Sequence, residues 1–554
     1  MITRHTAAAI CFLLPLAGFA AAGAPGPRNQ AVSLSAYQTV RYVSAAGSDQ
    51  SGDGSKSKPW AIVAHALKQS GAAGPSARVA VLVAGGVYRG QTLQLKPYVD
   101  LYGGYDPAGW LRDVARFPAV LDGENQHRIA IGADHARLDG FTLRRGRVRG
   151  KGGAILCDNT SPVIANNTFV ENGTAAPEPW NPPILHETAN DGGAIAALNG
   201  AAPSIEFNLF TRNRTENGRG GAIACDHEAS PRIAGNVIVQ NLTGVNDPMR
   251  SSDGGGISIY DHSHPLVSGN IIAANRTLNG NDAGGVFIAL WSAPRLEDNY
   301  IVGNFSSDDA GGLFIGGQKH HYGTPLDPVP PPAAFLIRLT GNTIIGNENP
   351  SHNSGAARIT MQARAELRNN VIARNEAGLY IQTAAADARH NTVADDLLVV
   401  NDSKASHELP GPTALVDSIF WGKSDLRMEA GIEHSDFRGS VPGKSVMSKD
   451  PMFLADGWTG PASLVARDPD GAFTTFKVTG LSADPSLADR AIRIGNFWTV
   501  VRSVSGGALS VWGVLPREFC DGDIRVEIVQ SYRLRPGSPC LGAGENGSNI
   551  GVQK

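Results

Sequence analysis

The sequence has few charged residues, few aromatic residues and no excess of charge of either sign. Of its 554 residues 18% are charged and 7% aromatic, and 48 Lys and Arg stand against 51 Asp and Glu, a formal net charge of -3. Such a composition argues against coiled coils and long helices. Because no broad cationic face is available to neutralise phosphates, we expect no nucleic-acid partner.

Long apolar runs are equally scarce. The run from Ala7 to Ala20 follows a basic start at Arg4 and ends near the small residues Ala22 and Ala24, the pattern of a secretory signal peptide. We therefore expect residues 1–24 to be removed and the mature chain to be secreted or periplasmic. No other stretch approaches the 18 apolar residues of a bilayer span, so we expect no membrane span.

Glycine is abundant, with 66 residues, and it marks an internal repeat. Each unit has a Gly-Gly pair before a short apolar run, followed by two asparagines five residues apart. The glycine pairs are at 152–153, 192–193, 220–221, 254–255, 284–285 and 311–312. The asparagine pairs are Asn167/Asn172, Asn208/Asn213, Asn236/Asn241, Asn270/Asn275, Asn299/Asn304, Asn342/Asn347 and Asn370/Asn375. Constant spacings within units of variable length indicate short strands joined by variable turns.

A parallel β-helix explains this repeat, because each of its coils has three short strands that pair with their equivalents above and below. At an inward turn, an asparagine amide can donate and accept along the stack, which gives the repeated Asn a structural role. The residues two positions after the second glycine should fill the core as one stripe. These are Ile155, Ile195, Ile223, Ile257, Phe287 and Phe314.

The remaining segments complete an all-β architecture. Residues 25–457 are expected to form the β-helix, and Lys58 to Ser70 to form a short amphipathic helix that caps its first coil. Alternating runs predict a small antiparallel β module over 458–530, and residues 531–554 are expected to rejoin the solenoid. Trp498 and Trp512 of this module either bind a ligand or pack in its core.

The cysteines fit an exported protein. Cys520 and Cys540 could close a short loop, since the expected compartment permits disulfides. The repeat places Cys157 and Cys225 two coils apart, too far for a disulfide, so we interpret both as small buried core residues.

Several motifs resemble the N-terminal and closing segments of secreted bacterial right-handed parallel β-helix proteins of the pectin-lyase-like superfamily. These motifs are Tyr42-Val43-Ser44, Gly85-Gly86-Val87-Tyr88, Leu101-Tyr102-Gly103-Gly104-Tyr105, Asp450-Pro451-Met452-Phe453 and Tyr532-Arg533-Leu534-Arg535-Pro536. The resemblance implies a right-handed parallel β-helix over most of the mature chain. That superfamily includes polysaccharide lyases, glycoside hydrolases, epimerases and non-catalytic surface proteins, and the catalytic motifs of polygalacturonases and pectate lyases have no counterpart here. The Gly-Gly-Ala-Ile units also resemble those of outer-membrane adhesins.

Charged residues alternate in sign just before the glycine pairs: Lys151, Asp191, Arg219 and Asp253. Stacked on successive coils, opposite charges satisfy one another, so we interpret them as a stabilising ladder. Arg219 separates the two carboxylates that calcium would need. No metal ligand and no cofactor are predicted, and calcium stays the one alternative.

At the other end of the same strand lie Asp158, Asp226-His227 and Tyr260-Asp261-His262, with Trp291 one coil further. The register makes His227 a neighbour of Asp261, and a carboxylate beside an imidazole orients it to take a proton. Asp226 and Asp261 could also have the separation of two hydrolase carboxyl groups. The alternative is that these are corner residues, because Asp and His bond local backbone in tight turns.

The sequence thus predicts a secreted protein that binds an extracellular polysaccharide and cleaves it as a lyase or a glycoside hydrolase. The predicted catalytic residues are Asp226, His227 and Asp261, supported by Tyr260 and His262. Long insertions beside the strand supply further sugar contacts, and the predicted substrate-binding residues are Trp180, Trp291, Lys319, His320 and Asp158. The alternative is a non-catalytic, adhesin-like surface protein. We expect a monomer.

Overall fold

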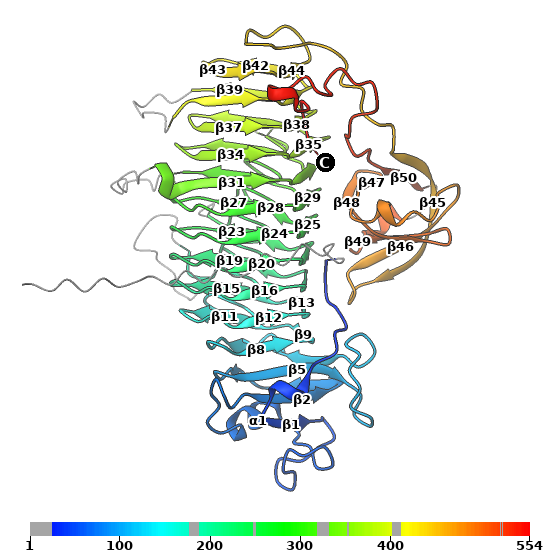
Figure 1. The fold of residues 1–554 in the computed structure, drawn as a ribbon. Helices are drawn as coiled ribbons and strands as arrows, with labels where there is room; N and C mark the ends of the chain where they lie inside the picture. Colours follow the sequence, from blue (N-terminus) through cyan, green and yellow to red (C-terminus); the bar gives the residue numbers. More distant parts are fainter. Residues whose placement is uncertain are drawn as a thin grey trace, which may run out of the picture.

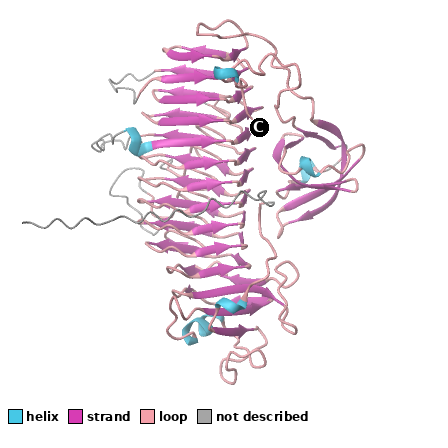
Figure 2. Cartoon of the chain, viewed as in Figure 1, coloured by secondary structure: helices cyan, strands magenta, loops and turns pink. Residues whose placement is uncertain are grey.

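Each sequence repeat forms one coil of a right-handed parallel β-helix, as the sequence predicts (Figure 1). The computed structural model describes residues 25–176, 188–246, 251–317, 332–351, 354–401, 411–520, 522 and 524–553. The predicted signal peptide lies outside these residues. Equivalent strands of successive coils pair in parallel and build three long sheets, while helical segments are few and short (Figure 2).

The three sheets have 14, 13 and 12 strands among the described residues. The 14-stranded sheet runs from β1 (Thr39–Val43) to β43 (Ala430–Glu433), the 13-stranded sheet from β3 (Gly86–Arg89) to β44 (Asp436–Phe437), and the 12-stranded sheet from β4 (Leu93–Gln94) to β42 (Ser424–Leu426). A shorter sheet of five strands extends from β10 (Arg147–Arg149) to β26 (Arg276–Thr277). One hydrophobic core fills the interior from Val43 to Phe437.

Asparagine side chains form two columns inside the solenoid, and this confirms the structural role predicted for them. The Oδ1 atom of Asn270 accepts from the backbone N and the Nδ2 of Asn236 at 2.8 and 2.9 Å, and its Nδ2 donates to the carbonyl of Ile233 at 2.9 Å. The first column continues from Asn167 to Asn391 and the second from Asn172 to Asn375. The second column ends on Asp395, whose Oδ2 accepts from Asn375 Nδ2 at 2.7 Å.

The predicted core stripe is correct for four coils and wrong for the next two. Ile155, Ile195, Ile223 and Ile257 pair in register and are fully buried. Val286 and Leu313, rather than Phe287 and Phe314, continue the stripe. The reason is that Ala283 (φ 55°) takes the left-handed position that Gly254 (φ 77°) occupies one coil earlier, so the next glycine pair lies one residue later. A one-residue shift reverses the face of every side chain, and both phenylalanines therefore point outward.

A short helix caps the first coil, as predicted, but it begins later. Helix α1 spans Val63–Gln69 and buries Val63, Ala66 and Leu67 against the core. Trp60 instead forms an isolated parallel bridge with Val43, and Ile62 has extended dihedral angles, so residues 58–62 are not helical. Among the described residues, no helix has the length and hydrophobicity needed to cross a bilayer.

The predicted antiparallel module is a closed six-stranded barrel beside the solenoid (Figure 1). Its strands are β45 (Trp458–Asp468), β46 (Phe473–Val478), β47 (Ala491–Ile494), β48 (Phe497–Ser505), β49 (Ala508–Trp512) and β50 (Ile524–Ile528). After it, Gly551 N donates to the carbonyl of Asp417 at 2.7 Å, so the C-terminal segment contacts the last coils.

The barrel packs on the outer face of the 13-stranded sheet, from β17 (Leu209–Thr211) to β35 (Val371–Ala373). Trp498 and Trp512 lie in this interface with Val239 and Ile271, so they pack between barrel and solenoid and not in the barrel core. Gln240 supports the contact, since its Nε2 donates to the Val514 carbonyl at 2.9 Å and its Oε1 accepts from Val514 N at 2.8 Å.

The four cysteines within the described residues form no disulfide. Cys157 and Cys225 are fully buried two coils apart, on either side of Ala197, as expected. The suggested Cys520–Cys540 bond is wrong, because Cys520 lies in the barrel core while Cys540 packs against the last coils and donates to Asp436 Oδ2 at 3.2 Å.

Candidate functional site

The predicted catalytic residues lie at the corner that follows two neighbouring strands of the 12-stranded sheet, β19 (Ile223–Asp226) and β23 (Ile257–Ile259). The backbone turns there through left-handed residues, with φ of 54° at His227, 49° at Asp261 and 54° at His262. Asp and related polar residues tolerate this conformation better than branched ones. The corner turns these side chains out of the core and brings them together across the two coils.

Four side chains form a continuous chain of alternating carboxylate and imidazole. His227 Nδ1 lies 3.0 Å from Asp226 Oδ1, and His227 Nε2 lies 3.6 Å from Asp261 Oδ2. The other oxygen of Asp261 contacts His262 Nδ1 at 2.8 Å. The predicted neighbour relation of His227 and Asp261 is thus present. The bond between Asp261 and the next residue, His262, adds a second carboxylate–imidazole pair that the coil register did not predict.

Asp226 is the buried anchor of this chain. Its side chain is 6% exposed, and Oδ2 accepts from the Lys151 ammonium at 2.8 Å. Burial alone would raise the pKa of Asp226, but the hydrogen bond from His227 and the nearby Lys151 charge outweigh it and lower the pKa. For Lys151, burial opposes the charge, but Asp191 at 2.9 Å and Asp226 raise its pKa. Asp226 is therefore held as a carboxylate and serves to position His227.

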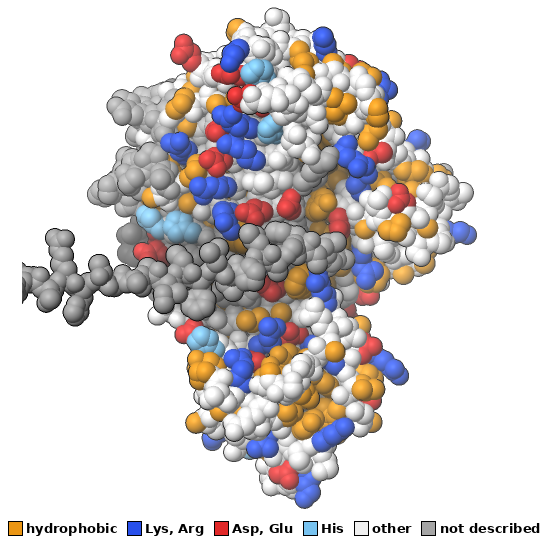
Figure 3. Space-filling view, viewed as in Figure 1, with side chains coloured by type: hydrophobic (Ala, Val, Ile, Leu, Met, Phe, Trp, Pro, Cys, Tyr) orange, Lys and Arg blue, Asp and Glu red, His pale blue; other side chains and the backbone are white. Residues whose placement is uncertain are grey.

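The other three members reach the surface. The exposed fractions of the side chains are 57% for His227, 44% for His262 and 27% for Asp261. In the space-filling view, histidines gather beside an acidic group at the edge of the stack, near the level of β23 (Figure 3). The hydrogen bond to Asp226, opposed by partial burial, raises the pKa of His227. A ligand arriving from solvent would meet the two imidazoles and Asp261 before Asp226.

Tyr260 and Trp291 are both buried, so neither side chain lies at the surface of the corner, where their predicted roles would place them. Tyr260 is 7% exposed, lies under the Arg219 guanidinium at 4.1 Å and stacks on Phe287. Trp291 is 1% exposed and packs edge-on against Phe335. Both belong to an aromatic cluster on the outer face of the sheet, because the register shift described above turned Phe287 outward.

Asp158 lies two coils from Asp226, at the matching end of β11 (Ile155–Asp158). It is exposed and accepts from Asn199 Nδ2 at 2.7 Å, so it stands apart from the chain of four. The other predicted sugar contacts, Trp180, Lys319 and His320, lie outside the described residues.

The charge ladder before the glycine pairs is present as predicted. Lys151 pairs with Asp191 at 2.9 Å, and Arg219 with Asp253 at 3.8 Å. Lys151 also reaches Asp226 at the opposite end of the strand two coils away, and this link between ladder and site was not predicted. The small outward residues Ala196 and Ala224 leave room for that path.

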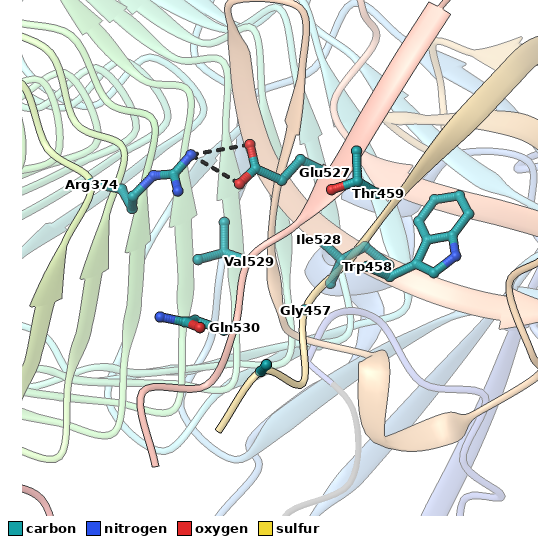
Figure 4. A pocket seen from close by; sticks show the side chains of 9 residues that line it. Arg374, Gly457, Trp458, Thr459, Glu527, Ile528, Val529 and Gln530 are labelled. Atoms are coloured by element: carbon teal, nitrogen blue, oxygen red, sulfur yellow. Dashed lines mark hydrogen bonds and ion pairs between the residues drawn. The ribbon is translucent and has the colours of Figure 1, made fainter. Parts of the chain in front are cut away.

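A second concave feature lies where the barrel meets the solenoid. A cavity of about 270 Å³ is lined by Arg374, by residues 455 and 457–459, and by residues 527–530. Arg374 bonds both oxygens of Glu527 at 2.9 and 3.0 Å, and the Trp458 ring points away from this pair (Figure 4). This ion pair is satisfied within the protein, and no motif in the sequence predicts the cavity.

Residues 45–270 match a family model described as "Protein of unknown function (DUF1565)". That family consists of parallel β-helices, in agreement with the three parallel sheets. The matched segment includes Asp226, His227, Asp261 and His262, and its description assigns no activity. No curated protein matches the chain.

Proposed function

We propose that this protein is exported and binds an extracellular polysaccharide, which it cleaves at the corner after β19 and β23. A parallel β-helix suggests a polysaccharide-binding or polysaccharide-acting protein, and the N-terminal segment 1–24 has the composition of a signal peptide. One observation carries the proposal of cleavage. Two exposed imidazoles, His227 and His262, are each held by a carboxylate through Nδ1.

A carboxylate on Nδ1 fixes the imidazole tautomer and leaves Nε2 to exchange a proton with a ligand. His262 Nε2 is the group in this position, because Nδ1 of the same ring contacts Asp261. General acid–base catalysis by a positioned side chain contributes about 10²–10⁴-fold to a rate. The corner therefore has the groups needed for proton transfer.

Among the two cleavage reactions, elimination fits the geometry better than hydrolysis. Hydrolysis needs two carboxyl groups on either side of the scissile bond, but Asp226 is buried and paired with Lys151. Elimination at a uronate needs one base: it takes the C5 proton, the C4–O bond breaks as the C4–C5 double bond forms, and the leaving oxygen takes a proton from water. We assign the base to His262, with Asp261 as its positioning residue.

A non-catalytic surface protein is the second candidate, and the backbone favours it. Left-handed residues occur at the same corner in coils without acid–base groups, for example Asn199 and Leu290. The conformation of His227, Asp261 and His262 is thus explained by the turn itself. In that case the corner would bind glycan without cleaving it.

Incubation with a panel of acidic and neutral polysaccharides separates these possibilities. Absorbance of unsaturated uronates reports elimination, reducing ends without that absorbance report hydrolysis, and retention on immobilised glycan without product reports binding alone. We expect unsaturated products from an acidic glycan and a loss of at least about 100-fold in His262→Gln. His264→Gln, which changes an exposed histidine on the same corner, should retain activity. Full activity in His262→Gln would disprove the assignment.

A further inference from the structure

We infer that the same corner binds a divalent transition-metal cation between His227 and Asp261. Asp226, His227 and Asp261 each offer one ligand atom, and these atoms lie within 4.8 Å of one another. This inference goes beyond the proposed function, because binding of the cation can be measured without any glycan.

The gap between the two donor atoms has the width that a metal ion needs. His227 Nε2 and Asp261 Oδ2 are 3.6 Å apart, beyond the usual length of a hydrogen bond. A cation at about 2.1 Å from a nitrogen and an oxygen holds them about 3.4 Å apart at a tetrahedral angle, and about 3.6 Å apart at 120°. The ion therefore fits between the two side chains without moving them.

Contacts on the far side of each side chain hold both donor atoms beside this gap. Asp226 Oδ1 holds His227 Nδ1 at 3.0 Å, the carboxylate–histidine–metal arrangement that orients metal-binding imidazoles. Lys151 fixes Asp226 through its other oxygen. On the opposite side, His262 Nδ1 occupies Asp261 Oδ1 and leaves Oδ2 for the ion.

The donor types select the kind of cation. One imidazole nitrogen with one carboxylate oxygen suits Zn²⁺ or Mn²⁺, whereas Ca²⁺ requires six to eight oxygens. This site is also distinct from the charge ladder at the other end of the strand, where Arg219 separates the carboxylates.

The cation would keep open positions toward solvent, since His227 is exposed and Asp261 is only half-buried. If the proposed function holds, these positions can accept the carboxylate of a uronate and offset the repulsion between that group and Asp261. His262 would then remain the imidazole that transfers the proton.

Titration of the full, EDTA-treated protein tests the inference directly. Calorimetry with Zn²⁺ alone and electron paramagnetic resonance with Mn²⁺ alone should both show one ion per chain. Affinity should fall at least 100-fold in His227→Gln and in Asp261→Asn, and about 10- to 100-fold in Asp226→Asn, which loses the orienting carboxylate. His264→Gln is the matched control and should bind as the wild type does.

Far-UV circular dichroism of each variant verifies that it is folded. Because His227 is the most exposed member, His227→Gln stays informative even if the other variants unfold. Absence of binding to the wild type, or unchanged affinity in folded His227→Gln, would overturn the inference. Metal binding without cleavage of any glycan would refute the proposed function and leave the cation site standing.

Discussion

Replacing one asparagine in the middle of the first column should destabilise the solenoid far more than its size suggests. Asn270 is fully buried, and Asn270→Ala removes the acceptor of two donors on Asn236, the backbone N–H and Nδ2. It also removes the donor to the Ile233 carbonyl. An unsatisfied buried donor costs about 1–3 kcal/mol, so we expect a loss of about 4 kcal/mol in the free energy of unfolding.

Urea unfolding followed by far-UV circular dichroism measures this loss, and hydrogen exchange should show reduced protection in the coils that contain Asn236 and Asn270. Asn270→Ser should lose less, because a hydroxyl can accept in this position, as Ser418 Oγ does from Asn391 N at 3.1 Å. The control Asn496→Ala removes an exposed asparagine of the barrel and should change stability by less than about 0.5 kcal/mol. A loss below 1 kcal/mol in Asn270→Ala would refute the reasoning.

Two further predictions concern the end of the second column and the barrel interface. Burial raises the pKa of Asp395 to about 6, so the folded state holds its proton more tightly than the unfolded chain and stability is lost as pH rises from about 4 through 6. At pH 7 the free energy of unfolding of Asp395→Asn should therefore exceed that of the wild type by up to about 3 kcal/mol, which thermal melts would show as a higher unfolding temperature. The two proteins should have the same stability near pH 4. A variant less stable than the wild type at pH 7 would contradict this. Trp498 packs against Gly303 and Gly346 of the solenoid, so Trp498→Ala should weaken barrel docking by about 3 kcal/mol. Limited proteolysis should then cleave between solenoid and barrel about 100-fold faster, and unchanged cleavage would show that the interface does not depend on this side chain.

The solenoid could be predicted because its determinants are local and repeated. Asparagines five residues apart recur in unit after unit, and such a constant spacing leaves one way to stack the coils. The predicted register is wrong from the coil of Ala283 onward, because Ala283 and then Ala310 adopt the left-handed conformation that glycine adopts in the earlier coils, for example at Gly254. The Gly284–Gly285 pair has the same appearance as the earlier glycine pairs, so the repeat predicts the wrong face for Phe287.

The candidate site was predictable in part for the same reason. His227 and Asp261 meet because they occupy equivalent places on adjacent coils, which follows from the repeat. The contact of Lys151 with Asp226 depends on a long side chain that crosses the strand and skips a coil, so no spacing in the sequence indicates it. Burial of Trp291 likewise depends on tertiary neighbours such as Phe335.

The docked barrel covers one of the three outer faces of the β-helix. It shields the outer surface of six consecutive strands, from β17 to β35, a length of about 24 Å at 4.8 Å per coil. A linear polymer lying lengthwise on these coils is excluded from that flank and must follow one of the two other faces. The histidine-bearing corner borders one of those two faces, so a long glycan bound as proposed would pass the corner while it extends along the axis and could not encircle the β-helix.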